Sequence, residues 1–138
     1  SQNKIICSSE DDEILSFDCR TQRSGVIPTH RKNPIRAIQV SGNKIACGFF
    51  DKTVLVFDER NTVQPLMRKM YPSCIWNVDF SGDNLLVSTY FNGLYQWNIQ
   101  TQEENRYMDT NSYFYSKYFD ARTIICSGRA DYVGVISL

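Results

Sequence analysis

A stretch of about 16 residues recurs along this chain at an interval of about 40 residues, and no other feature of the sequence limits the fold as strongly. The copies begin at Asn3, Asn43 and Asp83, and a fourth begins at Arg122 after a spacing of 39. A period near 40 is typical of proteins whose units cannot bury their apolar side alone and therefore stack on one another. The repeat predicts one domain of similar units, with bounds of roughly 3–42, 43–82, 83–121 and an incomplete 122–138.

Each copy contains two short apolar runs separated by residues that favour a turn. In the second copy, the runs 45–48 and 54–57 flank Asp51-Lys52, and the third copy has Asn92-Gly93 at this place. Asn-Gly is a strong signal for a β-hairpin, because both residues tolerate a positive φ. Extended segments at 35–40 and 75–80 lie upstream of the runs, and more polar segments at 65–69 and 104–108 lie downstream. Four short strands in about 40 residues predict an all-β fold of the propeller type.

The segment 50–58, with the sequence Phe-Asp-Lys-Thr-Val-Leu-Val-Phe-Asp, resembles the central signature of WD-repeat β-propellers. In that family an aspartate sits in the turn between the second and third strands, and an aromatic–Asp pair ends the third strand. The pair is found here as Phe17-Asp18, Phe57-Asp58 and Trp97-Asn98, and decays to Ile136-Ser137. The resemblance implies a partial β-propeller of about three to three-and-a-half four-stranded WD-repeat-like blades. Since closed propellers of this family need about seven blades, it also implies that an N-terminal half outside this chain is a partner.

The 40-residue phase also predicts which side chains are buried between neighbouring units. The expected core residues are Ile45, Cys47, Val54, Val56, Phe57, Leu85, Val87, Leu94 and Trp97, together with the aromatic residues Phe49 and Phe80. Three of the five cysteines, Cys7, Cys47 and Cys126, occupy one repeat position, which indicates small buried apolar residues rather than metal ligands. Free core thiols suit a reducing compartment, the cytoplasm or the nucleus.

Charge and motif content favour neither nucleic acid, nor a membrane, nor catalysis. Lysine and arginine number 15, aspartate and glutamate also 15, and no apolar run approaches the ~18 residues that span a bilayer. The one histidine, His30, has no acidic residue close by in the sequence, so we expect it to be structural or exposed. The acidic run Glu10-Asp11-Asp12-Glu13 lacks the spacing and glycine of a calcium loop and is interpreted as a solvated turn. We therefore expect no enzyme activity, no cofactor and no metal.

The resemblance assigns a partner-binding face to this chain. In WD-repeat propellers, partners often dock where the turns between second and third strands meet the beginnings of the inner strands. The residue before the turn aspartate is Glu10, Phe50, Tyr90 or Arg129 in the four copies. The residue after the first apolar residue of the inner strand is Arg36, Trp76 and, with a phase blurred by the spacing of 39, Tyr115. Aromatic residues and arginine dominate binding hot spots. The expected partner-binding face is therefore Arg36, Phe50, Trp76, Tyr90, Tyr115 and Arg129.

Two functions of different classes remain open from the sequence. The first is a protein–protein interaction scaffold that binds other proteins or peptides as part of a WD-repeat protein. The substrate-recognition subunits of ubiquitin ligases are a narrower example with similarly degenerate repeats. The alternative is a small-molecule-binding or hydrolase propeller whose chemistry lies in the other half.

Overall fold

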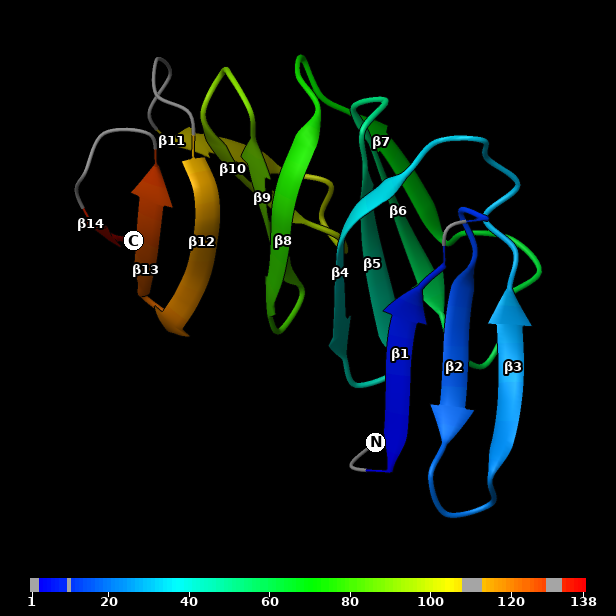
Figure 1. The fold of residues 1–138 in the computed structure, drawn as a ribbon. Helices are drawn as coiled ribbons and strands as arrows, with labels where there is room; N and C mark the ends of the chain where they lie inside the picture. Colours follow the sequence, from blue (N-terminus) through cyan, green and yellow to red (C-terminus); the bar gives the residue numbers. More distant parts are fainter. Residues whose placement is uncertain (1–2, 10, 108–112, 129–132) are drawn as a thin grey trace.

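Four antiparallel sheets follow one another along the chain, with no helix in the part that the structure describes (Figure 1). The computed structural model describes residues 3–9, 11–107, 113–128 and 133–138. The first and fourth sheets have three strands each, and the second and third have four. The sheets are arranged in an open arc with the first and fourth sheets at its two ends.

The strands are short, and within each sheet every strand pairs with the next one in the sequence. The first sheet is β1 (Lys4–Ser8), β2 (Ile14–Asp18) and β3 (Arg23–Ile27). The second is β4 (Ile35–Ser41), β5 (Lys44–Phe49), β6 (Thr53–Asp58) and β7 (Met67–Met70). The third is β8 (Ile75–Ser81), β9 (Asn84–Thr89), β10 (Leu94–Asn98) and β11 (Glu104–Tyr107). The fourth is β12 (Tyr113–Asp120), β13 (Thr123–Gly128) and β14 (Val133–Ser137). The all-β prediction is confirmed, and the strands predicted at 35–40 and 75–80 are β4 and β8.

Glycine and asparagine make the tight turns where the sequence places them. Asn92 and Gly93 have φ values of 83° and 98°, as the hairpin prediction requires. Gly42 and Gly82 come directly after β4 and β8, and their φ values are 59° and 60°. A residue with a Cβ is strained in this left-handed region, so these two glycines define equivalent corners of the second and third sheets. We call β4, β8 and β12, the first strands of the second, third and fourth sheets, the inner strands.

The core lies between neighbouring sheets, in three clusters. One cluster joins the first and second sheets and contains Ile14, Ile27, Ile45, Cys47, Phe49, Leu55 and Phe57. The central cluster joins the second and third sheets and contains Ala46, Val54, Val56, Tyr71, Ile75, Val78, Leu85, Val87, Tyr95, Trp97 and Ile99. The last cluster joins the third and fourth sheets through Leu86, Leu94, Tyr118, Ile124 and Cys126. The expected core residues in the second and third sheets are buried, and Phe80 packs partly buried against the central cluster.

One prediction of burial and one prediction of a strand boundary differ from the structure. Cys7 is exposed, although its repeat equivalents Cys47 and Cys126 are buried. Its side of the first sheet has no further sheet to pack against, so the same repeat position has no neighbour there. The outer strand predicted at 65–69 begins two residues later, at Met67, because Pro65 has no N–H to donate to a ladder.

Candidate functional site

In each of the two four-stranded sheets, the turn between the second and third strands lies next to the beginning of the first strand. Both of these places are on the same side of the molecule. In the second sheet, the backbone N–H of Phe50, in the turn between β5 and β6, donates to the carbonyl of Pro34 at 3.1 Å. In the third sheet, the N–H of Tyr90 donates to the carbonyl of Cys74 at 3.0 Å. These equivalent bonds hold each turn against the beginning of the inner strand of its sheet, on the upper side in Figure 1.

The inner strands are bulged at the residues that point toward these turns. Ile35 pairs with Phe49 and Ala37 with Gly48, so Arg36 is an extra residue in β4. Ile75 pairs with Thr89 and Asn77 with Ser88, which makes Trp76 the extra residue in β8. A β-bulge re-aims the side chain of the extra residue. Both side chains are thereby directed to the aromatic residues of the turns.

Five side chains form a continuous surface across the second and third sheets. The Arg36 guanidinium lies 5.1 Å from the Phe50 ring centroid and 5.6 Å from that of Trp76. The Trp76 and Tyr90 rings are 5.5 Å apart, and the Tyr90 and Phe91 rings meet edge to face at 4.2 Å. We call Arg36, Phe50, Trp76, Tyr90 and Phe91 the rim cluster. Half of Phe50 and 49% of Phe91 are exposed, so these rings face solvent at both ends of the cluster.

An ion pair fixes the turn that carries Phe50. The Asp51 carboxylate pairs with Arg31 and accepts a hydrogen bond from the Thr53 backbone N–H at 3.2 Å. The Arg31 guanidinium also lies 5.6 Å from the Phe49 ring centroid. Burial, and secondarily the charge of Arg68, lowers the pKa of Arg31. Asp51 is the turn aspartate of the WD-repeat resemblance, and its contacts place Phe50 at the surface.

Of the six residues predicted for the binding face, the structure brings four together: Arg36, Phe50, Trp76 and Tyr90. Arg129, like Glu10 of the first copy, lies outside the described residues.

The assignment of Tyr115 by repeat position is wrong. Tyr115 pairs with Ser127, so it corresponds to Ala37 in β4 and to Asn77 in β8. The extra residue in β12, which corresponds to Arg36 and Trp76, is Phe114. The irregularity at both ends of β12 shifts the strand, so the spacing of 39 does not align the two residues. Tyr115 is exposed and lines a hollow along the inner strands with Asn77 and Asp79.

The sequence reasoning did not find Phe91. This ring stands where the second copy has the turn aspartate Asp51, one residue after Tyr90. Its backbone N–H donates to Ser73 Oγ at 3.3 Å. The sequence did contain a signal for Phe91, because it places an aromatic residue where the repeat has an aspartate. A turn does not require a large apolar side chain at this position, so the ring indicates another role.

A buried carboxylate links three inner strands. Asp79 in β8 accepts a hydrogen bond from Gln39 Nε2 in β4 at 2.6 Å, and another from the Tyr118 backbone N–H in β12 at 2.8 Å. Asp79 is only 5% exposed. The inner strands of three sheets are thereby held to one another by one side chain.

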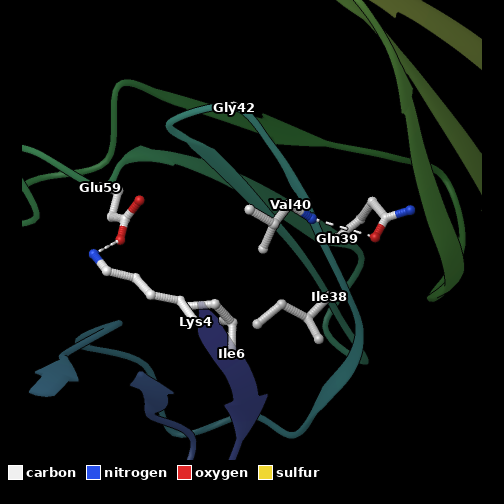
Figure 2. A pocket seen from close by; sticks show the side chains of 7 residues that line it. All are labelled: Lys4, Ile6, Ile38, Gln39, Val40, Gly42 and Glu59. Atoms are coloured by element: carbon white, nitrogen blue, oxygen red, sulfur yellow. Dashed lines mark hydrogen bonds and ion pairs between the residues drawn. The ribbon is translucent and has the colours of Figure 1, made fainter. Parts of the chain in front are cut away.

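A second concave region lies between the first and second sheets (Figure 2). It has a volume of about 300 Å³, and Ile6 in β1 and Ile38 in β4 line its floor. Lys4 and Glu59 form an ion pair at its edge. Its charged groups are paired with each other, so this hollow offers less to a ligand than the rim cluster.

Among the residues that the structure describes, the thiol, imidazole and acidic side chains show no arrangement for catalysis. Burial raises the pKa of the Cys47 thiol to about 12, which makes it a poor nucleophile. His30 is exposed, with a φ of 54°. Thr29 Oγ1 donates to the carbonyl of Asp12 at 2.7 Å, which ties the turn after β1 to the segment after β3. Within the described ranges, no group of three or more His, Cys, Asp or Glu side chains is placed to hold a metal ion.

The same part of the chain also has no helix of the length and apolarity needed to cross a bilayer.

The fold and the rim cluster together define an all-β repeat protein made of stacked antiparallel sheets, with arginine and aromatic side chains gathered on one side. No protein-family model and no curated protein matches the chain. Among solved structures, it is similar to a computationally designed protein, Ika4, known from a crystal structure. The TM-score is 0.87 at 20% sequence identity, over 100% of this chain and 87% of the designed one. At this identity the similarity concerns the fold alone.

Proposed function

We propose that this chain is part of a WD-repeat β-propeller and acts as a protein-interaction scaffold that binds an extended peptide segment across the rim cluster. The observation that carries the proposal is the continuous contact from Arg36 through Trp76 and Tyr90 to Phe91. Aromatic rings and arginine are the side chains that most often carry binding energy in interfaces. The repeated segments on which the WD-repeat resemblance is based coincide with equivalent strands in successive sheets, which supports the assignment.

The chemistry of the cluster favours an acidic partner with an apolar or aromatic side chain. Within the described part of the chain, Arg36 makes no ion pair, and its guanidinium lies against two ring faces. A guanidinium held in this way keeps its edge available for bidentate hydrogen bonds to a carboxylate. The exposed rings of Phe50 and Phe91 offer flat apolar surface on either side of that charge. A peptide with Asp or Glu next to a large apolar residue complements both features.

The test is selection of peptides from a random 12-residue display library on the intact chain. Enriched peptides are expected to contain Asp or Glu beside an aromatic or aliphatic residue. Phe50→Ala and Trp76→Ala should each weaken their binding by tenfold or more, since hot-spot truncations cost about 2 kcal/mol or more. Arg36→Gln should weaken acidic peptides selectively, and Arg36→Lys should restore only part of the affinity.

Phe119→Ala provides a matched control, because Phe119 is an exposed aromatic residue at the opposite end of β12 from the rim side. Its substitution should leave peptide binding unchanged. Equal binding by the wild-type chain and by folded Trp76→Ala would move the site away from the rim cluster. Enrichment of basic peptides instead would contradict the proposed partner chemistry.

A further inference from the structure

Each sheet uses alternate residues for two opposite faces, and the repeat determines which residue serves which face. In the second sheet, Ile45, Cys47, Leu55 and Phe57 pack toward the first sheet, whereas Ala46, Val54 and Val56 pack toward the third. The third sheet directs Leu85, Val87, Tyr95 and Trp97 to the second, and Leu86 and Leu94 to the fourth. We call the face toward the preceding sheet the front and the other the back. The chain thus builds the same front-to-back contact three times.

The front of the first sheet repeats this pattern without a sheet to cover it. Ile5, Cys7, Leu15 and Phe17 stand 40 residues before the four front residues of the second sheet, and all four are exposed. With Val26 they line an apolar hollow of about 380 Å³. None of the described residues that line that hollow is charged. A monomeric protein rarely leaves a contiguous surface of this kind in water.

The back of the fourth sheet has the complementary pattern. Ile125, Val133 and Val135 take the positions of Ala46, Val54 and Val56, the residues that receive the front of the next sheet. Val133 and Val135 are 69% and 66% exposed, and Ile125 is 36% exposed. Alternation along β13 and β14 directs these side chains away from the third sheet, since Ile124, Cys126 and Ile136 already pack against it.

We propose that two copies of this chain bind head to tail, with the back of the fourth sheet of one copy on the front of the first sheet of the other. The two surfaces match because they repeat, position by position, the contact that already joins the sheets within one chain. Such a contact uses different surfaces on the two partners and therefore either closes into a ring or continues as a filament. Two copies supply eight sheets, two times the four in the described part of one chain, which is within the range of about four to eight found in closed rings of this type. We therefore infer a closed pair in which the contact is made twice. The inference does not depend on the rim cluster.

The experiment is sedimentation equilibrium of the intact chain between about 1 and 100 µM, together with two face variants. The wild-type chain should sediment with twice the mass of one chain. Ile5→Lys places a charge on the front and Val135→Lys places one on the back, and each should lower the pair's association constant at least 100-fold. Both residues are solvent-exposed in one copy, so the variants should remain folded by circular dichroism. Val63→Lys, at a 75% exposed loop residue outside both faces, is the matched control and should pair normally.

The two face variants also distinguish head-to-tail pairing from pairing of like faces. A front-to-front dimer would lose its association with Ile5→Lys and be indifferent to Val135→Lys, which would overturn the proposal.

Alkylation gives a second readout, because Cys7 lies on the front face and should react more slowly at high concentration. The alkylation rate of the exposed Cys19, directly after β2, should not change. A wild-type chain that is folded and monomeric at 100 µM, with Cys7 reactive throughout, would also overturn it. That outcome would assign both faces to another part of a longer protein.

Discussion

Among the individual residues, Gly48 shows how closely the second and third sheets approach. A Cβ built on Gly48 would lie 2.3 Å from Ile75 Cγ2 and 3.4 Å from Val78 Cγ1. Real Cβ atoms do not come this close to a carbon atom, and Ile75 is fully buried. Gly48→Ala should therefore destabilise the chain by about 1–3 kcal/mol through overpacking. Urea denaturation followed by tryptophan fluorescence measures this change.

A double-mutant cycle separates the clash from other effects of the substitution. Ile75→Ala alone should cost about 2–5 kcal/mol, because it leaves a cavity. The double variant should cost clearly less than the sum of the two, since the added methyl group occupies part of that cavity. Additive effects would mean that Gly48 matters for a reason other than its contact with Ile75.

The carboxylate of Asp58 gives a prediction for pH. The Arg60 side chain donates to both oxygens of this carboxylate, at 2.9 and 2.6 Å, and its backbone N–H donates at 2.9 Å. These bonds lower the pKa of Asp58 from 3.8 to about 2. Because the folded pKa lies below the unfolded value, the stabilisation is complete above about pH 4 and is lost as the pH falls toward 2. NMR titration should find Asp58 near 2 in the intact chain and at a higher pKa in Arg60→Ala, which stays below 3.8 because the backbone N–H of residue 60 still donates to the carboxylate. An Asp58 that titrates near 4 in both chains would contradict the bidentate pair.

Between elements, the inner strands depend on Asp79 for their lateral contact. Its two acceptor bonds join β8 to β4 and β12, and substitution by alanine leaves the half-buried Gln39 amide and the buried Tyr118 N–H without this acceptor. A buried donor left without an acceptor costs about 1–3 kcal/mol. Asp79→Ala should therefore lower stability by at least that amount and speed hydrogen exchange at the Tyr118 amide. Asp83→Ala, which removes a surface partner of Lys44, should leave that amide unchanged. Equal protection of Tyr118 in both variants would show that packing and the hydrogen bond from Asn77 Nδ2 to the Ser116 carbonyl hold the strands together without Asp79.

The sequence predicts an element well where residues close together in the chain determine its structure. The strands and the Asn92-Gly93 turn follow from alternation and turn chemistry within a few residues, so they were predicted closely. The bulge in β12 was not, because a one-residue change in spacing leaves open which residue is displaced. Tyr115 was therefore assigned a place that Phe114 occupies. Phe91 was missed for a related reason, since it breaks the repeat at the turn position that the pattern assigns to aspartate.

In the whole molecule, the stack determines what a repeat position contributes. Phe17, Phe57 and Trp97 are equivalent in the sequence, yet Phe17 is 41% exposed, whereas Phe57 and Trp97 are 1% and 2% exposed. The repeat position alone does not predict this difference, because burial depends on whether a sheet lies in front. Asp79 illustrates the same limit, since its partners come from two other sheets.

This difference gives a prediction for three matched substitutions, measured by urea denaturation at about 1 µM, where the proposed pairing of copies is weakest. Phe57→Ala and Trp97→Ala should each lower the free energy of unfolding by about 3–5 kcal/mol, because each removes a large ring from a cluster between two sheets. Phe17→Ala should cost less than about 1 kcal/mol, because its ring already contacts water and leaves no enclosed cavity. At 100 µM the wild-type chain should gain stability by mass action through the paired faces, and Phe17→Ala should gain less. Equal costs for Phe17→Ala and Phe57→Ala at 1 µM would mean that the first sheet is covered even in one copy, and the open arc would then be wrong.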